Sequence, residues 1–134
     1  MKEYAVVNEA AEALAERFLP GALTLVMQAT ALMPVSVTLN EAVGIRIPDD
    51  PFCLALARAF GRPFTATSAN KSGRETPVSV HEVIAQFGHQ AHEIHLAIDA
   101  GEKKGKQAST VVTTVSGTPH LLREGAISRE TLGL

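Results

Sequence analysis

The chain has 134 residues, and its 12 basic and 14 acidic side chains give a formal net charge of −2. This near balance argues against a protein that mainly coats nucleic acid or an anionic membrane. Apolar residues make up 46% and charged residues 19%, a composition that excludes an intrinsically disordered chain. A single cysteine, Cys53, excludes a disulfide framework and suits a reducing compartment, so we expect a cytoplasmic protein. The longest apolar run, residues 52–57, is far too short to cross a membrane, and we expect no membrane partner.

The first half of the chain predicts two helices and two strands. Apolar residues from Ala10 to Phe18 recur every four positions, which is the spacing of one helix face, and Pro20 ends that helix. Asp50 has the side chain of an N-cap, and Gly61 that of a C-cap, for a second helix. The expected elements are a helix over 9–18, strands over 22–28 and 43–47, and a helix over 51–60.

The second half predicts shorter elements between polar loops. Ser79 has the side chain of a helix N-cap, and residues 110–115 are rich in the β-branched types typical of strands. The expected elements are a strand over 64–67, a helix over 80–87, a strand over 94–98, a basic turn over 101–107, strands over 110–115 and 120–122, and a last helical turn over 128–132. This irregular alternation, without repeats or linkers, predicts a single α/β domain over residues 1–134.

Three local features suggest a metal site, a phosphate loop and a nucleophile, but their spacing or sequence surroundings argue against each. His89, His92 and His95 recur every third residue, but their side chains would diverge on a helix or a strand, so we expect no metal site. The Gly101–Gln107 segment has three residues between its glycines instead of four, and no helix is expected after it. We therefore expect a solvated basic turn rather than a phosphate loop. Cys53 has no histidine near it in sequence, and we expect a packed thiol rather than a nucleophile.

A distributed set of polar residues gives a stronger signal. Ser68 and Asn70 follow a predicted strand, Ser109 precedes another, Arg123 ends a third, and Arg46 lies within a fourth. Arginine offers a planar fork to carboxylate or phosphate, and short hydroxyl and amide side chains add orientable hydrogen bonds. An anion or nucleotide site at the strand ends is one interpretation. Ordinary turn chemistry is the other, because these residue types are also common in turns.

Five motifs follow one another along the chain: Pro20-Gly21-Ala22-Leu23-Thr24, Val43-Gly44-Ile45-Arg46-Ile47-Pro48, Ser68-Ala69-Asn70-Lys71-Ser72-Gly73, Ser109-Thr110-Val111-Val112 and Leu122-Arg123-Glu124-Gly125-Ala126-Ile127. Together they resemble the YrdC/TsaC family of threonylcarbamoyl-AMP synthases. The resemblance covers nearly the whole chain and corresponds to the C-terminal two-thirds of the family domain. It implies an α/β fold of the α+β type, an open twisted mixed sheet flanked by helices, with the N-terminal part missing.

The resemblance implies an enzyme that converts ATP, L-threonine and bicarbonate into threonylcarbamoyl-AMP and pyrophosphate, for the threonylcarbamoyladenosine modification of tRNA. By position, Arg46, Ser68 and Ser109 correspond to residues on the threonine side, and Asn70 and Arg123 to ATP contacts. ATP is then a substrate, with magnesium as the expected counter-ion. Transfer RNA or tRNA-modification proteins are further partners that the resemblance implies. It names no general base and no protein metal ligand.

Departures from the family pattern leave other functions open. The family's N-terminal Thr-x-Thr-x-Tyr-Gly stretch and Lys-x-Arg motif are not found in this sequence, and Thr24 has a place in a motif but no assigned contact. Ala42, Val78 and Thr113 stand where other residues are common in the family. We therefore expect the chain alone to be weakly active or inactive, and a separate N-terminal segment to be a partner. The alternatives are a non-catalytic nucleotide- or RNA-binding module and the carbamoyl-transfer domain of a larger maturation protein.

Overall fold

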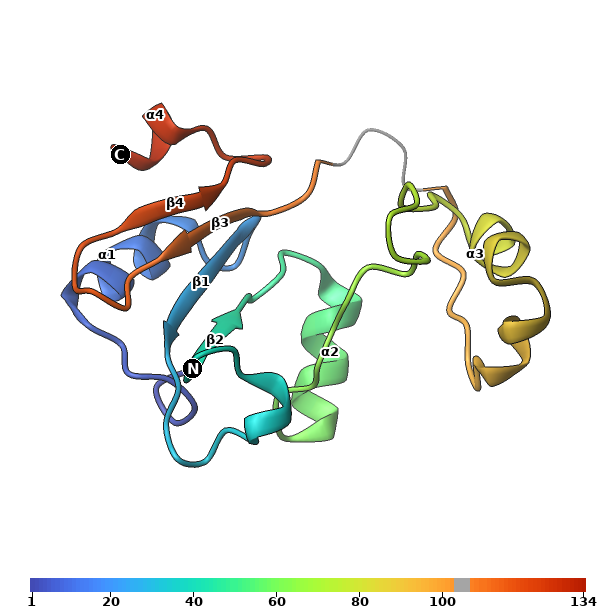
Figure 1. The fold of residues 1–134 in the computed structure, drawn as a ribbon, viewed down its shortest axis with the longest axis horizontal. Coiled ribbons are helices and arrows are strands. Elements are labelled where there is room, and N and C mark those ends of the chain that lie inside the picture. The colour runs from blue at the N-terminus through green and yellow to red at the C-terminus, as the bar shows by residue number, and fades with distance from the viewer. Residues whose placement is uncertain (103–106) are drawn as a thin grey trace. The chain divides into compact units, whose positions relative to one another are not determined.

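The computed structural model describes residues 1–102 and 107–134 and divides the chain into two compact units (Figure 1). The first unit consists of Met1–Phe64 together with Gln107–Leu134. The second is Thr65–Lys106, of which residues 65–102 are described. The single domain expected over 1–134 stays a prediction.

The first unit is built on a four-stranded sheet with the order β2-β1-β3-β4 (Figure 1). Strand β1 (Leu23–Gln28) is antiparallel to β2 (Ala42–Ile45) and parallel to β3 (Thr110–Thr113), which is antiparallel to β4 (His120–Arg123). Four of the expected strands, those over 22–28, 43–47, 110–115 and 120–122, are therefore present. The strands predicted over 43–47 and 110–115 each end two residues early, and Arg46 follows β2 instead of lying within it, because the pairing with β1 ends at Ile45. The parallel pair and the two antiparallel pairs make the sheet mixed and open, which confirms the predicted α/β class.

One face of this sheet forms the core. Burial alternates along β1, so its first, third and fifth residues are fully buried and the residues between them are half-buried on the opposite face. Helix α1 (Glu9–Phe18) has the predicted bounds and packs against the buried face. Its N-cap, Asn8, accepts a hydrogen bond from the Ala11 amide at 3.0 Å and donates one to the Thr114 carbonyl at 2.6 Å. The buried apolar residues are Ala5, Ala11, Leu14, Leu23, Leu25, Met27, Val43, Val112 and Leu132.

The remaining helices of the first unit follow their sequence signals. Helix α2 (Pro51–Phe60) begins at the Asp50 cap, whose carboxylate accepts the Cys53 amide at 3.0 Å, and ends at Gly61 with a φ of 71°. A short 3-10 turn, η1 (Val35–Val37), and the terminal helix α4 (Arg129–Leu132) complete the unit. No described helix is both long enough and apolar enough to cross a membrane.

The second unit contains α3 (Val80–Phe87), with its predicted bounds, followed by the 3-10 segment η2 (Gly88–Glu93). No residue described between positions 65 and 102 is buried. The strands predicted over 64–67 and 94–98 are wrong: both segments lack strand hydrogen bonding. Their alternating apolar residues have no neighbouring strand in the described chain to pair with, and pairing is what turns an extended segment into a strand.

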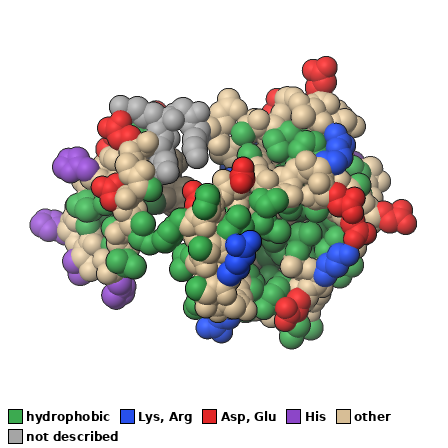
Figure 2. All heavy atoms as spheres, turned by 180° about the vertical axis from the view of Figure 1, so that it is seen from behind, with side chains coloured by type: hydrophobic (Ala, Val, Ile, Leu, Met, Phe, Trp, Pro, Cys, Tyr) green, Lys and Arg blue, Asp and Glu red, His purple; other side chains and the backbone are tan. Residues whose placement is uncertain are grey.

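Of the two clusters that the sequence analysis singled out in this unit, only the three histidines lie wholly in the described part of the chain. The structure brings no three His, Cys, Asp or Glu side chains of the described chain close enough to hold a metal ion. Figure 2 shows the histidine side chains projecting separately from the surface. The absence of metal binding at His89, His92 and His95 stays a prediction. Residues 103–106 of the expected basic turn lie outside the described part of the chain.

Candidate functional site

A row of polar side chains crosses the uncovered face of the sheet in the first unit. Leu25 pairs with Ile45, the last residue of β2, and because the two strands are antiparallel the chain runs on from Ile45 through Arg46 in the direction of Thr24. Thr24 is also in register with Val111 of β3, and Val111 is opposite Arg123 of β4. Side chains two residues apart on a strand share a face, which adds Ser109 just before β3. We call Arg46, Thr24, Ser109 and Arg123 the polar row.

Ser109 is at the centre of the row and is the most buried of its members, with 8% of its surface exposed. Its Oγ lies 2.8 Å from Oγ1 of Thr24, a hydrogen bond in which either hydroxyl can be the donor. On the other side, Nη2 of Arg123 donates to the Ser109 carbonyl at 2.9 Å and lies 3.5 Å from Oγ. The serine hydroxyl is therefore held between a threonine and a cation.

Arg46 is fixed at one end and open at the other. Its Nε donates to the carbonyl of Gly21 at 3.0 Å, in the turn that leads into β1. Within the described chain its two terminal amino groups have no hydrogen-bond partner, and the residue is exposed. A guanidinium anchored in this way presents a fork of N–H donors suited to a carboxylate or a phosphate.

Hydrogen bonds join the loop after β4 to Thr110, the residue that follows Ser109. The buried Thr110 donates from Oγ1 to the Ile127 carbonyl at 2.6 Å and accepts the amides of Gly125 and Ile127 at 3.0 Å. Gly125 passes so close that a Cβ there would lie 2.2 Å from the Ala108 carbonyl oxygen. Because neighbouring strand residues face opposite ways, Thr110 fixes this loop while Ser109 faces the polar row.

A small hollow lies beside this loop. Gln107, Ala108, Glu124 and Gly125 line it, so its wall offers backbone groups and two polar side chains.

The second unit carries the other two predicted site residues, Ser68 and Asn70. The Asn70 amide group donates to the carbonyls of Lys71 and Arg74, both at 3.0 Å, while its Oδ1 is buried without a partner in the described chain. Gln86 of α3 holds the same loop: its Oε1 accepts the Lys71 amide at 2.6 Å, and its Nε2 donates to the Glu75 carbonyl at 3.0 Å. The loop that carries Asn70 is therefore tied to α3.

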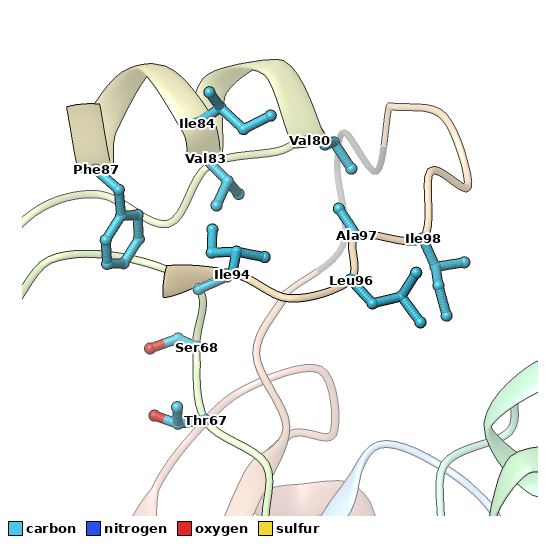
Figure 3. A pocket seen from close by; sticks show the side chains of 11 residues that line it. Thr67, Ser68, Val80, Val83, Ile84, Phe87, Ile94, Leu96, Ala97 and Ile98 are labelled. Carbon is cyan, nitrogen blue, oxygen red and sulfur yellow. The ribbon is translucent and has the colours of Figure 1, made fainter. Parts of the chain in front are cut away.

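Ser68 borders an apolar hollow in the same unit. Figure 3 shows Val83 and Phe87 of α3 directed toward Ile94, with Thr67 and Ser68 at the edge of this cluster. The unit thus places a hydroxyl side chain next to an apolar surface, and a polar loop follows directly.

The structure brings three predicted site residues, Arg46, Ser109 and Arg123, to one face of one sheet. Ser68 and Asn70 belong to the other unit, so the convergence of all five stays a prediction. Sequence reasoning missed the contacts of Thr24 and the clamp formed by Gln86. A signal for the first was that Thr24 lies two residues from Val26 and four from Gln28, on the face of its strand opposite the buried leucines; no sequence signal pointed to the second.

The fold and the row define an α/β domain with an uncovered, cationic sheet face suited to a small anionic ligand. A family model for the Sua5/YciO/YrdC domain, described as "Telomere recombination", matches residues 1–125. The chain belongs to this family.

Two threonylcarbamoyl-AMP synthases are among its relatives. The enzyme from Pyrococcus abyssi is 38% identical over 125 residues, which are 92% of this chain and 36% of the relative. The one from Bacillus subtilis is 39% identical over 124 residues, 91% of this chain and 35% of the relative. The chain thus spans little more than a third of the length of either enzyme.

A solved structure agrees with the sequence relationship. The crystal structure of P. abyssi Sua5 complexed with L-threonine matches with a TM-score of 0.83 and 38% identity, covering 95% of this chain and 37% of that one. Both the fold and the family are therefore shown, and the relative is a protein that binds threonine.

Proposed function

We propose that this chain is part of an L-threonylcarbamoyladenylate synthase, which converts ATP, L-threonine and bicarbonate into threonylcarbamoyl-AMP and pyrophosphate for the modification of tRNA. The observation that carries the proposal is the polar row, in which the buried Ser109 hydroxyl lies between Thr24 and Arg123, and Arg46 keeps an open guanidinium fork. The names of the P. abyssi and B. subtilis relatives, and the threonine complex of the former, support it.

The threonine side of the reaction uses Arg46, Ser109 and Ser68. The open fork of Arg46 binds the amino-acid carboxylate, and the two serine hydroxyls orient the rest of the ligand. The amine of threonine and bicarbonate form a carbamate with loss of one water molecule, and a carbamate oxygen then attacks the α-phosphorus of ATP while pyrophosphate leaves.

The nucleotide side uses Asn70 and Arg123. Asn70 belongs to the loop assigned to the ATP side, and the positive charge of Arg123 stabilises the phosphate charge that develops during transfer. Arginine stays protonated, and serine and threonine hydroxyls are not bases at neutral pH, so the row itself supplies position and charge rather than a general base.

Magnesium enters with ATP as the counter-ion of the substrate. The described part of the chain gathers no three His, Cys, Asp or Glu side chains that could surround a metal ion. In nucleotide sites Mg²⁺ is often held largely by phosphate oxygens and water. No step assigned to this chain's residues depends on it.

The test is threonine-dependent release of pyrophosphate from ATP in the presence of bicarbonate. We expect low activity from the 134-residue chain alone and a rise when a family N-terminal segment with its Lys-x-Arg motif is supplied, because phosphoryl transfer depends on preorganised charge. The Ser109→Ala variant should abolish the rise. Full activity of the chain alone would refute the need for the segment. Steep salt-dependent tRNA binding without threonine or nucleotide binding would favour a binding module instead.

A further inference from the structure

Thr24 is the one member of the polar row to which the proposed function gives no role. We propose that Thr24 is a positioning residue: it fixes the direction of the Ser109 hydroxyl so that this group offers its proton to an oxygen atom of the bound amino acid. Thr24 thereby sets the preference for a ligand with a hydroxyl on its side chain. The identity of the ligand, L-threonine, rests on the proposed function.

The packing around Thr24 determines where its oxygen lies. A Cβ built on Gly44 of β2 would come within 3.4 Å of Cγ2 of Thr24, so the methyl group of the threonine faces β2. The hydroxyl faces the opposite way, toward β3, where Oγ of Ser109 lies 2.8 Å from it. A β-branched side chain on a central strand has few rotamers to choose from. Oγ1 of Thr24, the hydrogen-bond partner of Ser109 on this side, therefore has a fixed position.

The directions of the hydroxyl protons of Thr24 and Ser109 follow from their neighbours. Each hydroxyl has one proton and two acceptor sites, so the Thr24–Ser109 hydrogen bond uses one of the two protons and leaves the other. Nη2 of Arg123 lies 3.5 Å from Oγ of Ser109 and can only donate, so it favours a serine oxygen that turns its lone pairs toward the cation. With Thr24 as donor on one side and Arg123 on the other, the serine proton is directed away from both. The remaining direction is the uncovered face of the sheet.

The position of Arg46 fits a ligand of amino-acid size. Arg46 directly follows Ile45, the last residue of β2, and Ile45 pairs with Leu25, the residue after Thr24. Neighbouring strands are about 4.8 Å apart. A carboxylate bound by the Arg46 fork thus leaves the side chain of a small amino acid within reach of the Thr24–Ser109 pair. Gly44, on the same face as both, is exposed and has no side chain to fill the space between them.

Thr24 could also have a purely structural role, in which its hydrogen bond only joins β1 to β3. Three variants distinguish this role from the positioning of Ser109. Thr24→Val keeps the shape and branching of the side chain and removes only the hydroxyl, whereas Thr24→Ser keeps the hydroxyl and loses the methyl group. Thr113→Val is the matched control, because Thr113 shares the same face of the neighbouring strand and its Oγ1 has only a 3.4 Å contact with the Val115 amide.

The first measurement is calorimetric titration of the wild-type chain and the three variants with L-threonine and with L-valine, which has the same shape but no hydroxyl. We expect Thr24→Val to weaken L-threonine binding about tenfold, the cost of one well-placed hydrogen bond, and to leave L-valine binding unchanged. Thr24→Ser and Thr113→Val should keep the wild-type ratio of L-threonine affinity to L-valine affinity. A Thr24→Val variant that keeps this ratio, or weakens both ligands equally, would overturn the inference.

The second measurement needs no ligand and separates this inference from the proposed function. The Hα–Hβ couplings of Ser109 in NMR report its side-chain rotamer, which should be single in the wild type and in Thr113→Val but averaged in Thr24→Val. An unchanged rotamer in Thr24→Val would refute the positioning role whatever the ligand is. Averaged couplings in Thr24→Val, together with a wild-type chain that binds no L-threonine, would support the positioning of Ser109 and overturn the proposed ligand.

Discussion

Replacing Gly125 by alanine should loosen the loop that supports the polar row. A Cβ at this position would lie 2.2 Å from the Ala108 carbonyl oxygen and 2.7 Å from the carbonyl carbon of Ser109, whereas real Cβ contacts stay above 3.0 Å. Since the obstacles are backbone atoms, no side chain can rotate out of the way. The loop and the start of β3 must move apart instead.

The expected loss of stability follows from the hydrogen bonds between the loop and the start of β3. The Gly125 amide donates to the Thr110 hydroxyl at 3.0 Å, and the Ala126 amide donates to the Ala108 carbonyl at 2.9 Å. Opening the contact to a tolerable distance would break both, and each contributes about 1 kcal/mol net to stability. We expect Gly125→Ala to lower the free energy of unfolding by about 2–3 kcal/mol.

Urea denaturation followed by circular dichroism measures this loss. Gly44→Ala is the control, because a Cβ there meets its nearest neighbour at 3.4 Å, an ordinary contact on the same sheet. Equal unfolding free energies for the two variants would show that the tight approach at Gly125 does not hold the loop.

Three further outcomes are expected. Gln86→Leu, but not Gln90→Leu on the exposed 3-10 segment, should speed hydrogen exchange at the Lys71 amide, because only Gln86 accepts that N–H; equal rates in both variants would refute the clamp. Arg46→Lys should weaken L-threonine binding about tenfold in calorimetry despite keeping the charge, because lysine has no planar fork, and unchanged affinity would remove Arg46 from the carboxylate site. Equilibrium dialysis should retain no stoichiometric zinc, whereas a bound zinc that is lost in His92→Ala would contradict the expected absence of a metal site.

Local signals in the sequence were enough to predict the helices. Asn8, Asp50 and Ser79 each accept an amide hydrogen bond three residues on, as their side chains and positions suggested, and the three longer helices begin where predicted. A cap depends on residues within one turn of each other, so it can be recognised without knowledge of the fold.

Features that depend on distant partners could not be predicted. Residues 94–98 alternate as a strand does, but alternation does not provide the neighbour that a strand needs. The contact between Thr24 and Ser109 joins residues 85 positions apart and exists only because β1 and β3 are parallel neighbours in one register. The close approach of Gly125 to Ala108 likewise depends on how the last loop returns to β3.

The most direct test of the site is an NMR titration of the isotope-labelled chain with L-threonine. A threonine site on the polar row predicts saturable shifts of the backbone amides of Thr24, Arg46, Ser109 and Arg123, while amides in the middle of α1, on the opposite face of the sheet, stay unchanged. D-threonine at the same concentrations should produce much smaller shifts. Absence of saturable shifts in the row, or equal shifts with both enantiomers, would contradict the assignment of this face to threonine.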